Sequence, residues 1–313
     1  MKAYAIDELG GQGSMHDIAP PEPTEGQVGV RVATAGLNPF DNKVLLGYMK
    51  DFMEHRFPLV PGMDASGTID ALGEGVAGWS VGDEVFGSVG KMYLGEGTLA
   101  EFVTMSVSSV APKRSLSHQA AAAIPTAGVT GLVMADALAL SEGHTVVAIG
   151  ASGGVGSYFV QLAARAGARV TAVCSGKNAD YVRGLGATDV IDYTAGDVVT
   201  AIRDRYPDGI DAIADMHGDK DEVAGLVELI RPGGHVASAV GAADIEALGS
   251  HGITATNVQG RVTTESLEAL SKMVEAGEII TPEVRSFTLA QAGEALAAVA
   301  TGHVRGKVVL NVA

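Results

Sequence analysis

Residues 146–178, VVAIGASGGVGSYFVQLAARAGARVTAVCSGKN, decide the fold of this chain. The stretch opens with an apolar run that ends at Ile149, and three glycines follow at intervals of three: Gly150, Gly153 and Gly156. Residues 155–166 then have an apolar face with helical spacing, and residues 169–174 form a second apolar run. Strand, glycine loop, helix and strand in this order predict a unit that binds a dinucleotide.

The glycines have a physical role in such a unit. They allow a tight turn, and they let backbone N–H groups approach a pyrophosphate at the helix N-terminus, where the helix dipole favours negative charge. A plain tight turn is the competing interpretation, and the flanking strands and helix favour the cofactor site. We expect the following loop residues to bind the cofactor: Gly150, Ser152, Gly153, Gly154, Val155 and Gly156.

The end of the second strand indicates which dinucleotide binds. An NAD site usually places a carboxylate there to hold the ribose 2′-hydroxyl. Here the chain has Ser175 and Lys177, and no carboxylate until Asp180. A hydroxyl and an ammonium suit a 2′-phosphate, so NADPH is the expected cofactor. Tyr193, at the end of the third strand, either packs on the adenosine or is a half-buried structural residue, and Lys177 is otherwise a solvated loop lysine.

The rest of the chain surrounds this unit with two other patterns. From about residue 118 helices alternate with wholly apolar strands, which predicts a parallel, doubly wound sheet. The expected strands are residues 145–149, 169–174, 189–191, 210–214, 235–240 and 253–256, with helices such as 155–166, 195–205 and 221–230 between them.

Before residue 118, short segments in which apolar and polar residues alternate lie between Gly/Pro turns, which predicts strands, for example at 28–33, 65–71 and 100–105. The tail has the pattern helix 266–276, strand 283–287, helix 290–300 and strand 307–312. We therefore expect an α/β protein with a β-rich domain at 1–117, a dinucleotide domain at 118–259, and a return of 260–313 to the first domain.

Composition excludes several classes of function. The 313 residues carry a formal net charge of −16, which repels nucleic-acid backbones. No run of about 18 apolar residues predicts a membrane span, and no leader pattern follows Met1. The single cysteine, Cys174, excludes an internal disulfide and a multi-thiolate metal site. We expect a cytoplasmic protein.

Six ordered motifs resemble the medium-chain dehydrogenase/reductase superfamily. They are PGMDASGTI (61–69), VGDEVFG (81–87), GTLAEFV (97–103), AAAAIPTAGVTG (120–131), the GASGGVG loop and GHVRGKVVL (302–310). The resemblance covers essentially the full chain and is greatest to the zinc-free NADPH:quinone oxidoreductases of the zeta-crystallin type. It implies a GroES-like catalytic domain beside a Rossmann domain.

The zinc-dependent alcohol dehydrogenases of this superfamily have ligands that this chain lacks. The resemblance aligns their catalytic cysteine with Asn38, and their His-Glu pair with Met63 and Asp64. Residues 88–96 hold no cysteine, so the four-cysteine structural lobe has no counterpart. A catalytic zinc needs about three protein ligands. We therefore expect no metal.

Hydride transfer without a metal requires an electrophilic acceptor, such as a quinone or an α,β-unsaturated carbonyl. The protein must orient that acceptor and donate a hydrogen bond to its oxygen. Asn38 is similar to the asparagine of the quinone reductase motif, whose amide lines the nicotinamide–substrate cleft. Its alternative role is to cap the turn before Pro39.

Four further residues are implied by the resemblance. Tyr48 lies near a tyrosine proton donor of related enoyl-thioester reductases, which by count would fall at Met49, and so it either lines the substrate site or donates a proton. Thr130 and Gly241 match positions near the nicotinamide. Lys307 lies in a segment placed beside the cofactor, where it reaches phosphate or forms a surface salt bridge. We also expect Asp41 and Lys43 to form a solvated ion pair.

Three functions remain open from the sequence. The first is an NADPH-dependent reductase of quinones or enones, with Asn38 and Tyr48 as catalytic residues. The second is an enoyl-thioester or polyketide-type enoyl reductase, and the third a non-catalytic NADPH-binding protein. The resemblance implies a homodimer, with residues 236–240 and 253–256 as the candidate edge.

Overall fold

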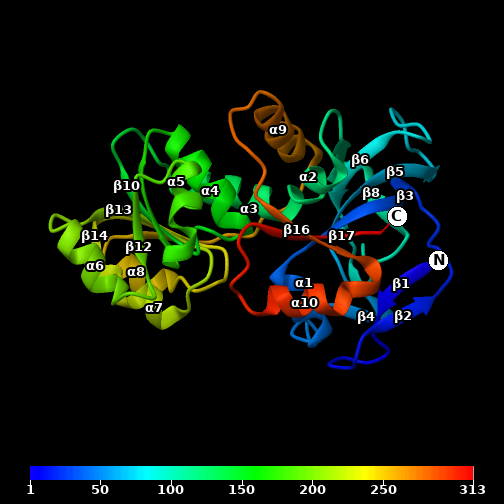
Figure 1. Ribbon diagram of the computed structural model, residues 1–313, viewed down its shortest axis with the longest axis horizontal. Coiled ribbons are helices and arrows are strands. Elements are labelled where there is room, and N and C mark those ends of the chain that lie inside the picture. The colour runs from blue at the N-terminus through cyan, green and yellow to red at the C-terminus, as the bar shows by residue number, and fades with distance from the viewer. Residues whose placement is uncertain (313) are drawn as a thin grey trace. The chain divides into compact units, whose positions relative to one another are not determined.

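The structure is a computed structural model, and it describes residues 1–312. The chain forms two compact units, whose elements can be followed by colour and label in Figure 1. Unit 1 contains residues 1–129 and the described residues from 262 onward, and unit 2 is Thr130–Arg261. The chain passes from unit 1 to unit 2 within helix α3 (Pro125–Ala137). The sequence predicted these boundaries at residues 117 and 259, whereas the structure divides at 129 and 261.

Unit 2 is built on one parallel sheet. Its strands are β10 (Thr145–Ile149), β11 (Arg169–Cys174), β12 (Asp189–Asp192), β13 (Ile210–Asp215), β14 (Ile230–Ser238) and β15 (Thr254–Asn257). They lie in the order β12-β11-β10-β13-β14-β15, and every neighbouring pair is parallel. The order reverses between β10 and β13, which is the switch point of a Rossmann sheet. The predicted fold class is confirmed.

Helices cover both faces of this sheet. They are α4 (Gly154–Arg165), α5 (Ala179–Gly184), α6 (Val198–Arg205), α7 (Lys220–Gly225) and α8 (Ile245–Ser250). Successive side chains of β10 point to opposite faces, as the strand geometry requires. Val146 and Ala148 belong to the same apolar cluster as Phe159 of α4, whereas Val147 belongs with Ile202 of α6.

Two sequence expectations in unit 2 need correction. The strand expected at 235–240 is β14, which begins at Ile230 and ends at Ser238, because the Ser238 side chain then accepts the N–H groups of Val240 and Ala242. β14 also lies inside the sheet, so only β15 of the expected pair is an edge strand. The helix expected at 221–230 ends at Gly225 and is followed by a 3-10 turn, Val227–Leu229.

Unit 1 is β-rich and mostly antiparallel. Its main sheet has the order β16-β17-β3-β5-β6-β9, with β8 also paired to β3, and two smaller sheets pair β1 with β2 and β4 with β7. The strands are β1 (Lys2–Ala5), β2 (Ser14–Asp17), β3 (Gln27–Leu37), β4 (Glu54–Val60), β5 (Asp64–Leu72), β6 (Glu84–Ser88), β7 (Tyr93–Glu96), β8 (Phe102–Ser106), β9 (Val110–Pro112), β16 (Val284–Thr288) and β17 (Lys307–Asn311).

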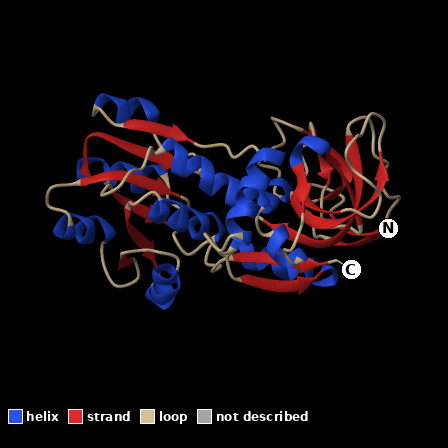
Figure 2. Cartoon of the chain, turned by 90° about the horizontal axis from the view of Figure 1, so that it is seen from above, coloured by secondary structure: helices blue, strands red, loops and turns tan. Residues whose placement is uncertain are grey.

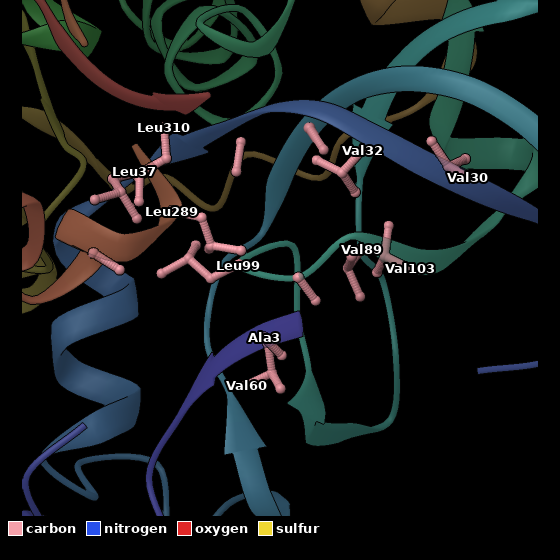
Figure 3. Packing of buried hydrophobic residues seen from close by; sticks show 14 of the residues in the cluster. Ala3, Val30, Val32, Leu37, Val60, Val89, Leu99, Val103, Leu289 and Leu310 are labelled. Atoms are coloured by element: carbon pink, nitrogen blue, oxygen red, sulfur yellow. The ribbon is translucent and has the colours of Figure 1, made fainter. Parts of the chain in front are cut away.

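The core of unit 1 joins the two ends of the chain. Val30 and Val32 of β3 belong to one buried apolar cluster with Val103 of β8 and Leu310 of β17, and Figure 3 shows Leu310 near Leu37. The red β17 lies beside the blue β3 in Figure 1, with Val308 opposite Leu37. The tail is therefore a structural part of the first unit.

Four α-helices lie wholly within the described part of unit 1; Figure 2 draws all helices of the chain in blue. They are α1 (Pro39–Leu45), α2 (His118–Ala122), α9 (Thr264–Glu275) and α10 (Ala292–Ala300). A Cβ placed on Gly36 of β3 would overlap the carbonyl oxygen of Ala122. This close approach fixes α2 on the sheet, and it explains why residues 118–129 belong to unit 1. Among the described helices of the chain, none is long and apolar enough to cross a bilayer.

Candidate active site

The glycine loop connects β10 to α4 at the switch point of unit 2. Gly150 has a φ of 76°, in the left-handed region that favours glycine. A Cβ on Gly156 would overlap the carbonyl oxygen of Gly150 and would lie 2.6 Å from that of Ala151. Gly156 is therefore required for α4 to pack closely against the loop. The twelve-residue α4 directs its first N–H groups toward this loop, which suits a pyrophosphate.

A side chain that the sequence did not single out ties this loop to the end of β11. The amide Nδ2 of Asn178 donates to the hydroxyl of Ser152 at 3.0 Å and to that of Ser175 at 3.3 Å. Ser175 and Asn178 are both buried, whereas Lys177 is exposed and Tyr193 is 44% exposed. The structure thus brings Ser152 and Ser175 together through Asn178. Asn178 directly follows Lys177, but no local motif marks it.

Asp192, at the end of β12, lies against the turn that carries Ser175 and Lys177. Its carboxylate accepts the N–H of Thr194 at 2.9 Å and the hydroxyl of Thr194 at 2.7 Å. The hydrogen bond from the Thr194 hydroxyl lowers the pKa of Asp192 most, and the one from the Thr194 N–H lowers it further. The carboxyl group is therefore ionised at neutral pH. A Cβ on Gly176 would overlap this carboxylate. A larger residue at Gly176 would therefore displace the Asp192 carboxylate.

A buried carboxylate orders the loops on the other side of the switch point. Asp215, at the end of β13, accepts the N–H of Gly218 at 2.6 Å and the hydroxyl of Ser238 at 2.6 Å. Ser238 in turn accepts the N–H of Ala242 at 3.0 Å, which holds the turn that contains Gly241. Gly241 has a φ of 80°. The expected cofactor residue Gly241 thus lies in a loop that Asp215 fixes.

Thr130, at the start of unit 2, lies against the segment that ends this unit. A Cβ on Gly260 would lie 2.6 Å from the Thr130 hydroxyl. Thr130 is 9% exposed. The residue is therefore packed beside the backbone of Gly260.

The polar centre of unit 1 is Asn38, the residue immediately before α1. Asn38 is only 4% exposed. Its amide Oδ1 accepts from Lys307 Nζ at 2.7 Å, and its Nδ2 donates to Asp64 Oδ2 at 2.9 Å. Its backbone N–H donates to Asp41 Oδ2 at 2.7 Å, which closes the first turn of α1. The backbone of Asn38 is thus held by Asp41 in the first turn of α1, while its side-chain amide is held by Asp64 and Lys307.

Asp64, the first residue of β5, is the fully buried carboxyl group beside Asn38. It also accepts the N–H of Thr126 at 3.1 Å and the hydroxyl of Thr126 at 2.7 Å. Lys307 Nζ lies 3.8 Å from Asp64 Oδ2. We refer to Asn38, Asp41, Asp64 and Lys307 as the Asn38 cluster. Among residues 1–312, no group of three or more His, Cys, Asp and Glu is arranged to hold a metal ion.

Lys307 therefore has a role different from the expected one. Its ammonium is buried and donates to the Leu37 carbonyl at 2.8 Å as well as to Asn38. It orients the amide of Asn38 and is neither a surface salt bridge nor an exposed phosphate ligand. Arg305, two residues earlier, forms a surface ion pair with Glu283.

The expected solvated pair of Asp41 and Lys43 is wrong. Asp41 is 1% exposed, because α1 turns its side chain back toward the Asn38 N–H, whereas Lys43 is exposed. Burial raises the pKa of the Asp41 carboxyl to about 7, the hydrogen bond from Asn38 opposes the rise, and the charge of Asp64 adds to it. Burial lowers the pKa of Lys307, while Asp64 and Asp41 oppose that change.

Tyr48 lies outside the Asn38 cluster. It follows α1, and its side chain is 64% exposed. No hydrogen bond joins it to Asn38 in the described part of the chain. The structure therefore gives Tyr48 no partner that would activate it as an acid.

Comparison with known proteins agrees with this architecture. Residues 24–115 match the family described as alcohol dehydrogenase GroES-like domain, and residues 185–310 match the family described as zinc-binding dehydrogenase. The mitochondrial NAD(P)H oxidoreductase RTN4IP1 of Bos taurus is 31% identical, over all of this chain and 89% of the relative. The chain belongs to the medium-chain dehydrogenase/reductase superfamily, in its quinone oxidoreductase branch.

Two other similar proteins extend the comparison. The 2-methylene-furan-3-one reductase of Solanum lycopersicum is 30% identical, over 99% of this chain and 79% of the relative. The solved quinone oxidoreductase of Coxiella burnetii has a TM-score of 0.88 at 29% identity and covers 100% of this chain and 99% of that one. This medium-chain reductase is thus a nicotinamide-dependent oxidoreductase.

Proposed function

We propose that this protein is a zinc-independent reductase that transfers hydride from NADPH to a conjugated carbonyl, either a quinone or an enone. The observation that carries the proposal is the orientation of the Asn38 amide. Lys307 holds its oxygen and Asp64 takes one of its two N–H groups, so a second N–H remains to donate. Related proteins named quinone oxidoreductase and 2-methylene-furan-3-one reductase support the same class of acceptor.

The amide supplies what such an acceptor needs. Bound NADPH provides the hydride, and conjugation moves the resulting negative charge onto the acceptor oxygen. A donor fixed in advance stabilises that charge without reorganising during the reaction. Because Lys307 draws electron density from the amide oxygen, it strengthens the remaining N–H as a donor.

The same residues argue against zinc at this position. A zinc ion needs about three N, O or S ligands, usually thiolate, imidazole or carboxylate. Here an amide and a thioether, Asn38 and Met63, stand at two ligand positions of the zinc enzymes. An ammonium lies 2.7 Å from that amide and would repel a second cation.

The preference for NADPH rests on the turn at the end of β11. Ser175 is held by Asn178 next to the glycine loop. The side chain of Lys177 is exposed, so its ammonium can contact a 2′-phosphate. Along the chain, no carboxylate follows the end of β11 before Asp180, whereas NAD sites usually carry one there for the 2′-hydroxyl. The glycine loop and α4 suit the shared pyrophosphate of both cofactors.

Cofactor oxidation tests the proposal. NADPH and NADH are each mixed with a simple quinone, a conjugated enone or a trans-2-enoyl thioester. The reverse reaction is assayed with an alcohol and the oxidised cofactor. Every assay is run with and without a zinc chelator. We expect quinone or enone reduction that ignores the chelator, with kcat/KM at least about tenfold higher for NADPH than for NADH. Chelator-sensitive alcohol oxidation would overturn the proposal, as would NADPH binding without turnover of any acceptor.

We also propose a cytoplasmic homodimer. The lone Cys174 is buried and unpaired, as suits a reducing compartment. β15 is an edge strand whose outer side is available for pairing with a second copy. Light scattering on a size-exclusion column would measure the mass, and a monomer at micromolar concentration would contradict the dimer.

A further inference from the structure

The Asn38 cluster buries more negative than positive formal charge. Asp41 and Asp64 are 1% and 0% exposed, and Lys307, at 4%, is the cation that lies among them. An isolated charge in such surroundings is costly unless it is paired and hydrogen-bonded. One ammonium cannot balance two carboxylates, so one of the two acids must be neutral for the cluster to carry no net charge.

Hydrogen bonds indicate which acid is ionised. Asp64 accepts from Asn38 Nδ2 and from two groups of Thr126, and Lys307 lies 3.8 Å away. Three hydrogen bonds and a nearby ammonium around one carboxyl favour its ionised form. Asp64 is therefore the anion that pairs with Lys307.

Asp41 has the opposite surroundings. Its Oδ2 accepts one bond, from the N–H of Asn38, and its buried Oδ1 accepts no hydrogen bond of normal geometry in the described part of the chain, although the N–H of Gly62 lies near the carboxyl. An ionised carboxylate would leave a charged oxygen without a donor, whereas a neutral carboxyl carries its proton there. Burial and the neighbouring Asp64 raise the pKa of Asp41 to about 7, which agrees with this geometry.

The orientation of Asn38 depends on this balance. Lys307 only donates and a carboxylate only accepts, so the amide has one orientation in which both contacts are favourable. Asp41 holds the backbone of the same residue. A second negative charge at Asp41 would compete with the amide oxygen of Asn38 for the ammonium of Lys307.

Resting on the function proposed above, we propose that Asp41, Asp64 and Lys307 are positioning residues for Asn38, and that Asp41 performs this role as a neutral acid. Loss of its proton weakens the hold of Lys307 on the amide and slows hydride transfer. The charged groups that face Asp41 are Asp64 from β5 and Lys307 from β17, and the backbone N–H groups of Asn38 and Gly62 also face it.

The pH profile of an isosteric variant tests the proposal. Wild type, Asp41→Asn and the control Asp51→Asn, which changes an exposed carboxyl just beyond α1, are assayed with NADPH and quinone from about pH 5.5 to about pH 9. In wild type and in Asp51→Asn we expect kcat to fall severalfold as the pH rises through about 7, with less change in the KM for NADPH. In Asp41→Asn this fall should be absent, because an amide cannot lose the proton. An alkaline fall that persists in Asp41→Asn would overturn the proposal.

An infrared measurement separates this inference from the proposed activity. The difference spectrum between wild type and Asp41→Asn at about pH 6 should contain the carbonyl band of a protonated carboxylic acid, and the band should vanish above about pH 8. Absence of the band at pH 6 would overturn the inference even in an active enzyme. Absence of quinone and enone reduction in wild type, with the band present, would instead overturn the proposed function.

Discussion

At the scale of single residues, the candidate active site depends on side chains whose hydrogen-bond partners are all satisfied in only one orientation. The amide of Asn38 is fixed because a pure donor and a pure acceptor contact its two ends. Asn178 similarly contacts the hydroxyls of Ser152 and Ser175. Both amides lie at the ends of helices or strands, where the backbone leaves the side chain free to reach another segment.

Replacing Lys307 by Met should lower kcat for quinone reduction about 10- to 100-fold, because the amide oxygen of Asn38 loses the donor that orients it. The KM for NADPH should change little. Steady-state kinetics would measure both constants, and Lys43→Met, an exposed lysine of α1, is the matched control. Wild-type kcat in a folded Lys307→Met protein would contradict the orienting role.

Replacing Lys177 by Ala should raise the KM for NADPH by about tenfold, equivalent to roughly 1–2 kcal/mol, and leave the KM for NADH nearly unchanged. The reason is the loss of a charge-assisted contact to the 2′-phosphate that NADH lacks. The measurement is steady-state kinetics with each cofactor at saturating acceptor. Equal effects on both cofactors would show that Lys177 does not read the phosphate.

At the scale of secondary-structure elements, close backbone approach decides where the site residues lie. α4 reaches the glycine loop because Gly156 has no Cβ, and the turn after β11 lies against the Asp192 side chain at Gly176. β17 brings Lys307 next to Asn38 because it pairs with β3 in the register that places Val308 opposite Leu37. The elements thus carry residues from distant parts of the chain to one place.

Gly156→Ala should weaken NADPH binding at least about tenfold and destabilise the protein by more than 1 kcal/mol, because the methyl group would overlap two carbonyl oxygens. Gly184→Ala is the matched control. That helical glycine in α5 has open space around its Cβ position, so the change should be neutral or stabilise by about 0.5–1 kcal/mol. Fluorescence titration and thermal denaturation would measure the two effects, and equal behaviour of both variants would contradict this account.

At the scale of the whole molecule, two separately packed units supply two kinds of chemistry. Unit 2 has the switch-point sheet and the loop that suit a dinucleotide. Unit 1 buries a polar cluster within a core built from both ends of the chain. The chain has a net charge of −16, so its surface as a whole repels anions. The positions of Lys177 and Lys307 are therefore important for attracting negative charge locally.

The free energy of unfolding should depend on pH because the pKa of Asp41 is raised in the folded protein. The folded chain keeps this proton up to about pH 7, whereas the unfolded chain releases it near 3.8. Between these values the folded state binds more protons, so the contribution of Asp41 to the free energy of unfolding declines as the pH rises from about 4 to about 7, and is lost above it. Urea unfolding across this window should show the decline as the difference between wild type and Asp41→Asn. A difference that does not depend on pH would contradict it.

Local sequence pattern was enough for the first two strands of unit 2. The expected strands 145–149 and 169–174 agree with β10 and β11 residue for residue, because uninterrupted apolar runs between glycine turns have few other stable conformations. The glycine loop was predictable for a similar local reason, because only glycine at position 156 leaves room for the backbone of the loop. Boundaries were less accurate where a side chain ends an element, as Ser238 does for β14.

The sequence by itself determined the superfamily, and it predicted the dinucleotide loop and Asn38 as candidate site features, because each follows from a contiguous motif. Only the tertiary structure decided the partners of Asn38. Lys307 is 269 residues away along the chain and Asp64 is 26 residues away, and no periodicity links them. Burial also reversed the expected solvated state of Asp41, because the sheet register and the first turn of α1 decide its environment. Charge state is a property of that environment, so it emerges only when the chain is folded.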